Sequence, residues 1–181
     1  MGVGGKGRLE TESELYQYAI AALARRMRSV AELKRLLRPR VDIETEIGRL
    51  LVELVIRRLK DQGYLNDFSY AAAYARFRRD NQKFGPRRVV TDLKAKGIHG
   101  DVIQAAVESA FAGVNEERLA REYLRRKRIA KPDGKNQAAR VVRQMIRAGF
   151  SAATTFKILR NWNLDEEFLA QLEGEVDGSG Q

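Results

Sequence analysis

Two runs of basic residues are the side chains in this sequence best suited to chemistry, because arginine and lysine bind phosphate and other anions. Residues 76–96 hold eight Lys or Arg against two acids, and residues 121–147 hold ten against two. The whole chain of 181 residues has a formal net charge of +10. Because the excess is concentrated in two runs, the sequence predicts a localised positive field that attracts an anionic partner.

The binding residues that we predict come from both runs. They are Arg76, Arg79, Lys83, Arg87, Arg88, Lys94, Lys96, Arg125, Arg126, Lys127, Arg128, Lys131, Lys135, Arg140 and Arg143. Guanidinium groups match phosphate oxygens, and we expect the helix start at Pro86–Arg88 to add free backbone N–H groups. The alternative is a solvated basic face, which is common on helical proteins. Two runs in matching positions favour anion binding, which would weaken steeply with salt.

Catalytic residues are hard to find in this chain. The single histidine, His99, stands among Gly97, Ile98 and Gly100, so we interpret it as a turn residue between helices. Cysteine is absent, which excludes disulfides and thiolate metal sites and agrees with a reducing compartment. There is no nucleophile elbow, Walker A sequence or dinucleotide fingerprint. We expect no enzyme, no cofactor and no metal site, with a Mg²⁺-dependent nuclease built from distant acids as the weaker alternative.

Aromatic residues near the basic runs have two interpretations. Tyr70, Tyr74 and Phe77 precede and enter the first run, and Tyr123 precedes the second. They could stack on nucleic-acid bases. Their helical spacing with Ala and Leu favours core packing instead.

Two segments about fifty residues apart share one pattern of residues. The pairs at a spacing of 49 are Asn66 and Asn115, Asp67 and Glu116, Tyr70 and Leu119, Ala71 and Ala120, Tyr74 and Tyr123. The pairs at a spacing of 52 are Val89 and Val141, Leu93 and Met145, Gly97 and Gly149, Ile98 and Phe150. Such self-similarity predicts stacked helical units. No alternation of β-branched residues indicates a sheet, so the expected fold is all-α: three tandem three-helix repeats in an elongated, curved array.

The expected boundaries follow caps and stops along the chain. Residues 1–10 form a disordered tail, 11–65, 66–113 and 114–162 the three repeats, and 163–181 a short helix with an acidic disordered tail. Thr11 with Glu14 and Ser29 with Glu32 are predicted capping boxes. Further predicted N-caps are Asp42, Asp101, Asn115 and Ser151. The helix after Asp42 is expected to bury the stripe Ile47, Leu50, Leu51, Leu54 and Leu59.

The termini and the hydropathy point to a cytoplasmic protein. The glycine-rich start lacks the apolar segment of a secretory signal, and no apolar stretch approaches the eighteen residues or so that a membrane span requires.

One region of the sequence resembles a known family. Gly63–Asp67, then Ala71 and Tyr74, then FRRDNQKFGPRRVVTDLKAKGI from Phe77 to Ile98, are similar to the signature of the RecX regulatory proteins. ALARRMRSVAELKRLL, from Ala22 to Leu37, resembles that family's first unit. The extra residues around Pro39–Glu46 depart from the pattern and make the first unit less regular.

The resemblance implies a fold of three tandem three-helix repeats and a function in homologous recombination and the SOS response. It implies a cytoplasmic regulator that binds the RecA filament on single-stranded DNA, lies in its groove, suppresses strand exchange and ATP hydrolysis, and favours disassembly. It also implies binding to single-stranded DNA, with double-stranded DNA as a further candidate, and no cofactor. We expect a monomer. The alternative is a stand-alone helical DNA- or RNA-binding protein without a RecA-type partner.

Overall fold

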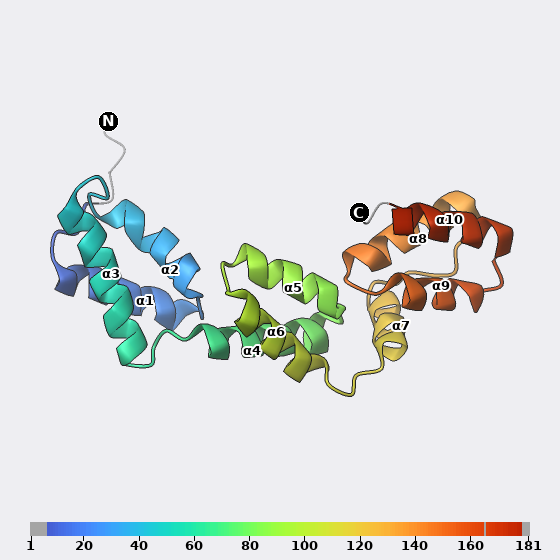
Figure 1. Ribbon diagram of the computed structural model, residues 1–181, viewed down its shortest axis with the longest axis horizontal. Coiled ribbons are helices and arrows are strands. Elements are labelled where there is room, and N and C mark those ends of the chain that lie inside the picture. Colours follow the sequence, from blue (N-terminus) through green and yellow to red (C-terminus); the bar gives the residue numbers. More distant parts are fainter. Residues whose placement is uncertain (1–6, 165, 179–181) are drawn as a thin grey trace. The chain divides into compact units, whose positions relative to one another are not determined.

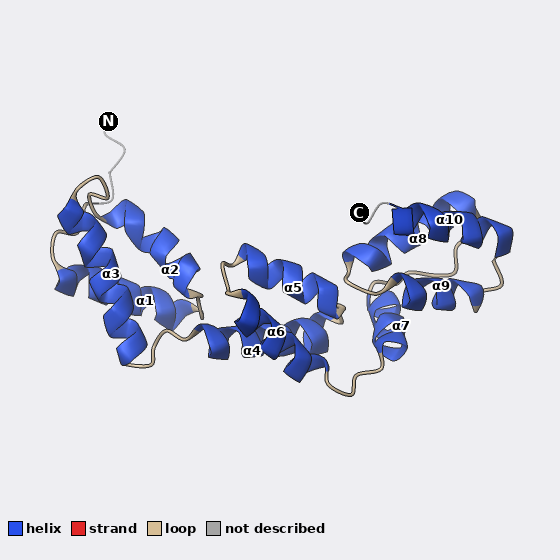
Figure 2. Ribbon diagram, viewed as in Figure 1, coloured by secondary structure: helices blue, strands red, loops and turns tan. Residues whose placement is uncertain are grey.

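Every regular element in the computed structural model, which describes residues 7–164 and 166–178, is a helix (Figure 1 and Figure 2). In chain order they are α1 (Glu12–Arg25), α2 (Val30–Leu37), the short 3-10 helix η1 (Arg38–Arg40), α3 (Glu46–Asp61), α4 (Asp67–Gln82), α5 (Pro86–Ala95), α6 (Gly100–Phe111), α7 (Glu116–Arg126), α8 (Lys135–Arg147), α9 (Ala152–Arg160) and α10 (Glu166–Gly178). Helices α1–α3, α4–α6 and α7–α9 form three tandem three-helix repeats. The predicted all-α class and repeat plan are confirmed.

The chain forms two compact units, and the division passes through the second repeat. Unit 1 contains the described residues up to Ala71 together with Leu93–Ile103. Unit 2 contains Ala72–Asp92 and the chain from Gln104 to the end of α10. Each unit has its own hydrophobic core and is described by itself.

The core of unit 1 forms where α1, α2 and α3 pack against one another. Leu15 from α1, Leu33 and Leu37 from α2, and Val55 and Leu59 from α3 are fully buried. Burying an aliphatic side chain of this size stabilises the fold by about 1.5–3 kcal/mol. These residues recur at helical spacing, so each helix turns one apolar face to the same centre.

The structure corrects two expectations for α3. The N-cap is Thr45, whose Oγ1 accepts a hydrogen bond from Gly48 N at 3.0 Å; Asp42 instead pairs with Arg8 at 2.7 Å. The predicted core stripe is also wrong in part, because Ile47, Leu50 and Leu54 are 72%, 51% and 49% exposed. The apolar residues on the other face of α3 are the ones that pack inward: Val52, Val55, Ile56 and Leu59.

The core of unit 2 is built mainly by α7, α8 and α9. Tyr123, Met145, Phe150 and Phe156 are buried at its centre. Helix α10 packs against α9 and adds Leu169 and Leu172 to the core. The segment expected as a short helix and tail therefore contains a packed helix, and residues 179–181 lie outside the described residues.

Most of the predicted caps occur in the structure. Both capping boxes form, at Thr11 with Glu14 and at Ser29 with Glu32. Asn115 caps α7, and Ser151 caps α9. The predicted N-cap at Asp101 is wrong, because α6 begins at Gly100 and Asp101 therefore lies inside its first turn. The predicted tail 1–10 is described only from residue 7, and Leu9 N there donates to Arg40 O at 2.7 Å.

Within the described part of the chain, no helix has both the length and the apolar character needed to cross a lipid bilayer.

Candidate anion-binding site

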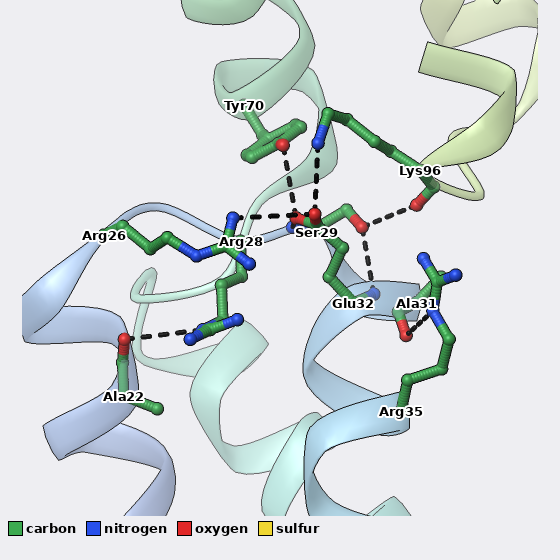
Figure 3. Close-up of polar contacts among 9 residues, drawn as sticks. All are labelled: Ala22, Arg26, Arg28, Ser29, Ala31, Glu32, Arg35, Tyr70 and Lys96. Atoms are coloured by element: carbon green, nitrogen blue, oxygen red, sulfur yellow. Dashed lines mark hydrogen bonds and ion pairs between the residues drawn. The ribbon is translucent and has the colours of Figure 1, made fainter. Parts of the chain in front are cut away.

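The turn that follows α5 contacts the start of α2, and both segments belong to unit 1 (Figure 3). Ser29, the N-cap of α2, donates its hydroxyl to Lys96 O at 2.7 Å. Gly97 sits so close that an added Cβ would lie 2.5 Å from Ala31 Cβ. From α4, Asp67 accepts a hydrogen bond from Val30 N at 2.9 Å. We call this contact the first junction.

Glu32 is the charged centre of the first junction, and its side chain is 12% exposed. Its carboxylate accepts hydrogen bonds from Lys96 Nζ and Tyr70 OH, each at 3.1 Å, and lies 3.6 Å from Arg26 (Figure 3). Burial opposes ionisation of Glu32, but the hydrogen bonds from Lys96, Ser29 N and Tyr70 outweigh it and lower its pKa. Glu32 is therefore an ionised and fully partnered carboxylate.

The turn that follows α8 contacts the start of α5 in the same way, within unit 2. Gly85 N donates to Ala148 O at 2.9 Å, and Arg87 N donates to Gly149 O at 3.3 Å. The backbones touch at two glycines, because an added Cβ on Gly85 would lie 2.3 Å from Gly149 O. We call this contact the second junction. The expectation of free N–H groups at the start of α5 is wrong for Arg87, because its N–H donates to Gly149 O.

A pocket of about 430 Å³ opens at the second junction. It is lined by Phe84, Arg88, Tyr123, Arg140, Arg143, Gln144, Arg147 and Ala148. Three of its four arginines come from α8, where positions 140, 143 and 147 share one helix face. The opposite face of α8 is buried in the core through Ala138, Val141 and Met145, which fixes the orientation of the arginine face.

One of the pocket arginines, Arg88, pairs with Asp92, a carboxylate that serves several donors. It accepts from Arg78 and from Tyr74 OH, and Arg88 Nε lies 3.0 Å away. The buried Nε of Arg78 has no hydrogen-bond acceptor among the described residues. The guanidinium of Arg78 lies 4.5 Å from the centre of the Phe84 ring, and Phe84 in turn contacts Tyr123.

The predicted binding residues divide into two groups. Five of them contact other groups of the protein: Arg79 with Asp80 and Ala110 O, Lys83 with Glu122, Arg88 with Asp92, Lys96 with Glu32, and Lys135 with the Phe168 ring. The others make no ion pair or side-chain hydrogen bond with the described residues: Arg76, Arg87, Lys94, Arg125, Arg126, Lys127, Arg128, Lys131, Arg140 and Arg143. The second group is exposed, so its charges face solvent.

The structure brings together only a small part of the predicted set. Arg88, Arg140 and Arg143 line one pocket, with Arg147, which the sequence reasoning did not select. The signal for Arg147 is its spacing of seven residues from Arg140, two helical turns along one face. The pocket could not have been found from sequence, because its other walls come from α5, the α4–α5 turn and Tyr123 of α7.

The other candidate chemistry has no geometric support among the described residues. His99 lies in the exposed turn before α6, 3.4 Å from Asp101, as interpreted from the sequence. No three His, Asp or Glu side chains of the described chain come close enough to hold a metal ion. The aromatic expectation is right for Tyr70 and Tyr123, which are buried, and wrong for Phe77, which is 52% exposed.

An all-α protein of tandem three-helix repeats with an arginine-lined pocket is the class that this fold and site define. Residues 66–107 match the family model described as the second three-helix domain of RecX. A regulatory protein RecX from Thermus thermophilus is 32% identical over 163 residues, which cover 90% of this chain and 96% of the relative. One from Pseudomonas putida is 31% identical, with 87% and 97% covered. The chain belongs to the RecX family of regulatory proteins.

Other relatives match over a smaller part of their length. For a regulatory protein RecX from Geobacillus thermodenitrificans the identity is 34%, and the match covers 75% of this chain but 49% of the relative. Two solved structures share the fold. A crystal structure of a regulatory protein RecX has a TM-score of 0.63 and 23% identity, covering 83% of this chain and 71% of that one. RecX from Lactobacillus salivarius has a TM-score of 0.63 and 21% identity, with 85% and 97% covered.

Proposed function

We propose that this protein binds the RecA filament on single-stranded DNA, lies in the groove of the filament, and inhibits strand exchange and ATP hydrolysis. Recombinational DNA repair is the process that such an activity modulates. Membership of the RecX family supports the proposal, and the relatives carry names of regulatory proteins rather than of enzymes.

The observation that carries the proposal is the set of exposed cations on the second and third repeats. Helices α7 and α8 and the segment between them present Arg125, Arg126, Lys131, Arg140 and Arg143 to solvent. Charges that have no partner in the described protein are available to an external polyanion, and a DNA-containing filament is one.

Repeats suit a filament partner for a physical reason. A filament presents the same protomer at a regular spacing, and a repeat protein presents related surfaces at its own spacing. Several weak contacts then act together with high effective concentration, provided that the spacings match. Occupation of the groove would exclude an incoming duplex, which accounts for the proposed loss of strand exchange.

The test is RecA-dependent ATP hydrolysis on single-stranded DNA with rising amounts of this protein. We expect inhibition at amounts stoichiometric with RecA or below. Unchanged hydrolysis at a stoichiometric amount, under salt conditions where the protein is soluble, would count against the proposal.

Direct nucleic-acid binding without a RecA-type partner is the second candidate function. The arginine-lined pocket favours it, because that pocket needs no filament to be formed. A salt titration separates the two candidates by comparing bare single strands with strands coated by RecA and ATP. Strong preference for the coated strand supports the regulator, and equal affinity supports the stand-alone binder.

A further inference from the structure

The two junctions are equivalent in register. In the first junction, Lys96 O, just before the turn glycine Gly97, accepts a hydrogen bond from Ser29 Oγ, and Ser29 directly precedes α2. In the second, Ala148 O, just before the turn glycine Gly149, accepts a hydrogen bond from Gly85 N, and Gly85 directly precedes α5. Lys96 and Ala148 are 52 residues apart, the same spacing as in the sequence repeat. Three residues beyond Ser29 and Gly85 stand Glu32 and Arg88, so these two side chains occupy the same place in the two junctions.

The charges at this place are balanced in the first junction and unbalanced in the second. Glu32 is satisfied by Lys96, Tyr70 and Arg26. Arg88 instead lines a pocket with three further arginines, and none of the eight lining residues is acidic. Asp92, which pairs with Arg88, is already shared with Arg78. The second junction therefore has a net positive charge that the described protein does not neutralise.

An external anion would complete this site. Guanidinium groups held together repel one another, and an anion among them replaces repulsion by charge-assisted hydrogen bonds. The side chains of Arg140, Arg143 and Arg147 are exposed and have no partner among the described residues. Phosphate oxygens are the acceptors that the planar guanidinium fork fits best, together with carboxylates.

The arrangement along α8 favours a chain of phosphates over a single ion. Seven residues separate Arg140 from Arg147, which is a rise of about 10 Å along the helix. A nucleic-acid strand carries one charge per roughly 3.4 Å of axis, so more than one phosphate fits along this distance. A second hollow, of about 450 Å³, adjoins the pocket and is lined by Asn136, Gln137, Ala139, Arg140 and Arg143. Arg140 and Arg143 line both hollows, so a flexible polyanion can pass from one to the other.

We propose that these two hollows form a binding groove for the phosphate backbone of a single-stranded nucleic acid, held by Arg88, Arg140, Arg143 and Arg147. A single strand is flexible enough to follow two adjoining hollows, whereas a duplex with a persistence length of about 150 base pairs stays straight. The proposal deepens the proposed function, on which it rests for the presence of DNA, by assigning the DNA contact to a stated site.

The test compares the affinity of full-length variants for a fluorescent oligothymidylate of about 15 nucleotides by anisotropy. Arg143→Gln/Arg147→Gln removes two pocket charges at exposed helix positions. The matched control, Arg25→Gln/Arg38→Gln, removes two exposed charges from the first repeat, where the described structure gives neither side chain a partner. We expect the pocket variant to bind at least about tenfold more weakly than the wild type, and the control to stay within about threefold.

The salt dependence of oligonucleotide affinity is a second measurement on the same variants. Each phosphate contact with a single strand contributes a slope of about −0.7 in a plot of log affinity against log salt. Loss of two arginine contacts should therefore make the slope of the pocket variant shallower by about 1.4. Equal slopes for the pocket variant and the control would assign the binding to general charge and overturn the proposal.

A third variant tests the comparison between the junctions. Gln144→Glu places one carboxylate of the same shape inside the pocket, on α8 rather than at the α5 position that corresponds to Glu32. We expect a higher melting temperature and weaker oligonucleotide binding, since the new carboxylate pairs with the arginines. Unchanged binding by Gln144→Glu would contradict the proposal even if the double variant were to fold poorly.

Two further arms separate this proposal from the function on which it rests. If the wild type inhibits RecA-dependent ATP hydrolysis but the pocket variant binds oligonucleotide normally, the proposed binding groove is wrong and the proposed regulatory function is supported. If the pocket variant loses oligonucleotide binding but the wild type leaves RecA unaffected, the proposed binding groove is supported and the proposed regulatory function is wrong. Competition by unlabelled duplex as strong as by single strands would overturn the preference for a single strand.

Discussion

Gly149 shows how one residue without a side chain determines the second junction. Its φ of +92° lies in the region that other residues rarely adopt, and an added Cβ would lie 2.2 Å from Arg88 N. The opposing residue is also a glycine, Gly85, so the two backbones approach closely enough to form a direct hydrogen-bonded contact.

We expect Gly149→Ala to destabilise the protein by about 3 kcal/mol, because the strained φ and the collision with backbone atoms add together. Urea unfolding followed by circular dichroism measures the change. Gly134→Ala is the matched control: Gly134 has extended φ, and nothing lies within 4 Å of its added Cβ. A loss as small in Gly149→Ala as in the control would show that the close backbone contact does not form in solution.

Glu32 determines the first junction through charge rather than close approach. Its carboxylate contacts Lys96, Tyr70 and Ser29, which come from two different repeats. Burial, and then the charge of Glu32, raise the pKa of the Tyr70 hydroxyl, so this hydroxyl remains a donor throughout the neutral range.

We expect Glu32→Gln to lower the free energy of unfolding by about 2 kcal/mol at neutral pH. The pKa of Glu32 is lowered in the folded state, so its ionised form stabilises the fold above the unfolded pKa of about 4.3. That contribution is lost as the pH falls through the folded pKa, and the difference between the two proteins should shrink there. Unfolding measured from neutral pH down to about pH 3 checks this.

Glu53→Gln is the control for that experiment. Glu53 pairs with Lys34 at 2.7 Å, but its side chain is 57% exposed, so the change should cost less than about 1 kcal/mol. A pH-independent difference for Glu32→Gln would contradict the role of the ionised carboxylate.

At the scale of elements, the start of α9 shows how α7 fixes a neighbouring helix. Ser151 caps α9, and Glu116 of α7 accepts hydrogen bonds from Ser151 N, Ser151 Oγ and Thr154 Oγ1 at 2.6–2.8 Å. Burial opposes ionisation of Glu116, yet these hydrogen bonds outweigh it and lower its pKa. The carboxylate also suits the positive end of the α9 dipole.

We expect Ser151→Ala to cost about 1–2 kcal/mol, because the N–H of Thr154 and one carboxylate oxygen of Glu116 lose a partner. Thermal unfolding of the variant measures this loss. The control is Thr91→Ala, which removes an exposed hydroxyl that bonds only the preceding turn of α5 and should change stability by less than about 0.5 kcal/mol. Equal effects of the two changes would rule out a special contribution of this cap.

Helix α3 shows where periodicity alone is ambiguous. Its sequence has apolar residues on more than one face, so the stripe with Ile47, Leu50 and Leu54 fitted a helix as well as the stripe that is buried. The choice came from α1 and α2, which pack against Val52, Val55 and their neighbours.

At the scale of the whole molecule, the distribution of charge predicts which repeats contact the partner. We expect Arg125→Glu/Arg126→Glu to weaken binding to the RecA–DNA filament by about tenfold or more at low salt, since two exposed cations become anions. Co-sedimentation with filaments measures the affinity, and circular dichroism checks that the helix content is unchanged.

The matched control reverses two charges in the first repeat, Arg25→Glu/Arg38→Glu, and alters the net charge by the same amount. A similar loss of filament binding in both variants would mean that net charge, rather than the position of the charges on the third repeat, governs the interaction. Unchanged affinity of the Arg125→Glu/Arg126→Glu variant at moderate salt would contradict the placement of the contact.

The sequence determined the local structure and predicted the type of partner. Caps at Thr11, Ser29, Asn115 and Ser151, glycine stops and the fifty-residue repeat depend on neighbouring residues in the chain, so the three-helix plan could be predicted. The basic runs predicted an anionic partner, because the charge of a short stretch of chain can be counted without knowing the fold.

The tertiary structure alone decided which cations are available and where they gather. It placed Lys83 and Lys96 in internal ion pairs and brought Arg88 from α5 beside three arginines of α8. It also put Glu32 and Arg88 in equivalent positions of the two junctions. These outcomes depend on contacts between residues far apart in the sequence, which helical periodicity does not specify.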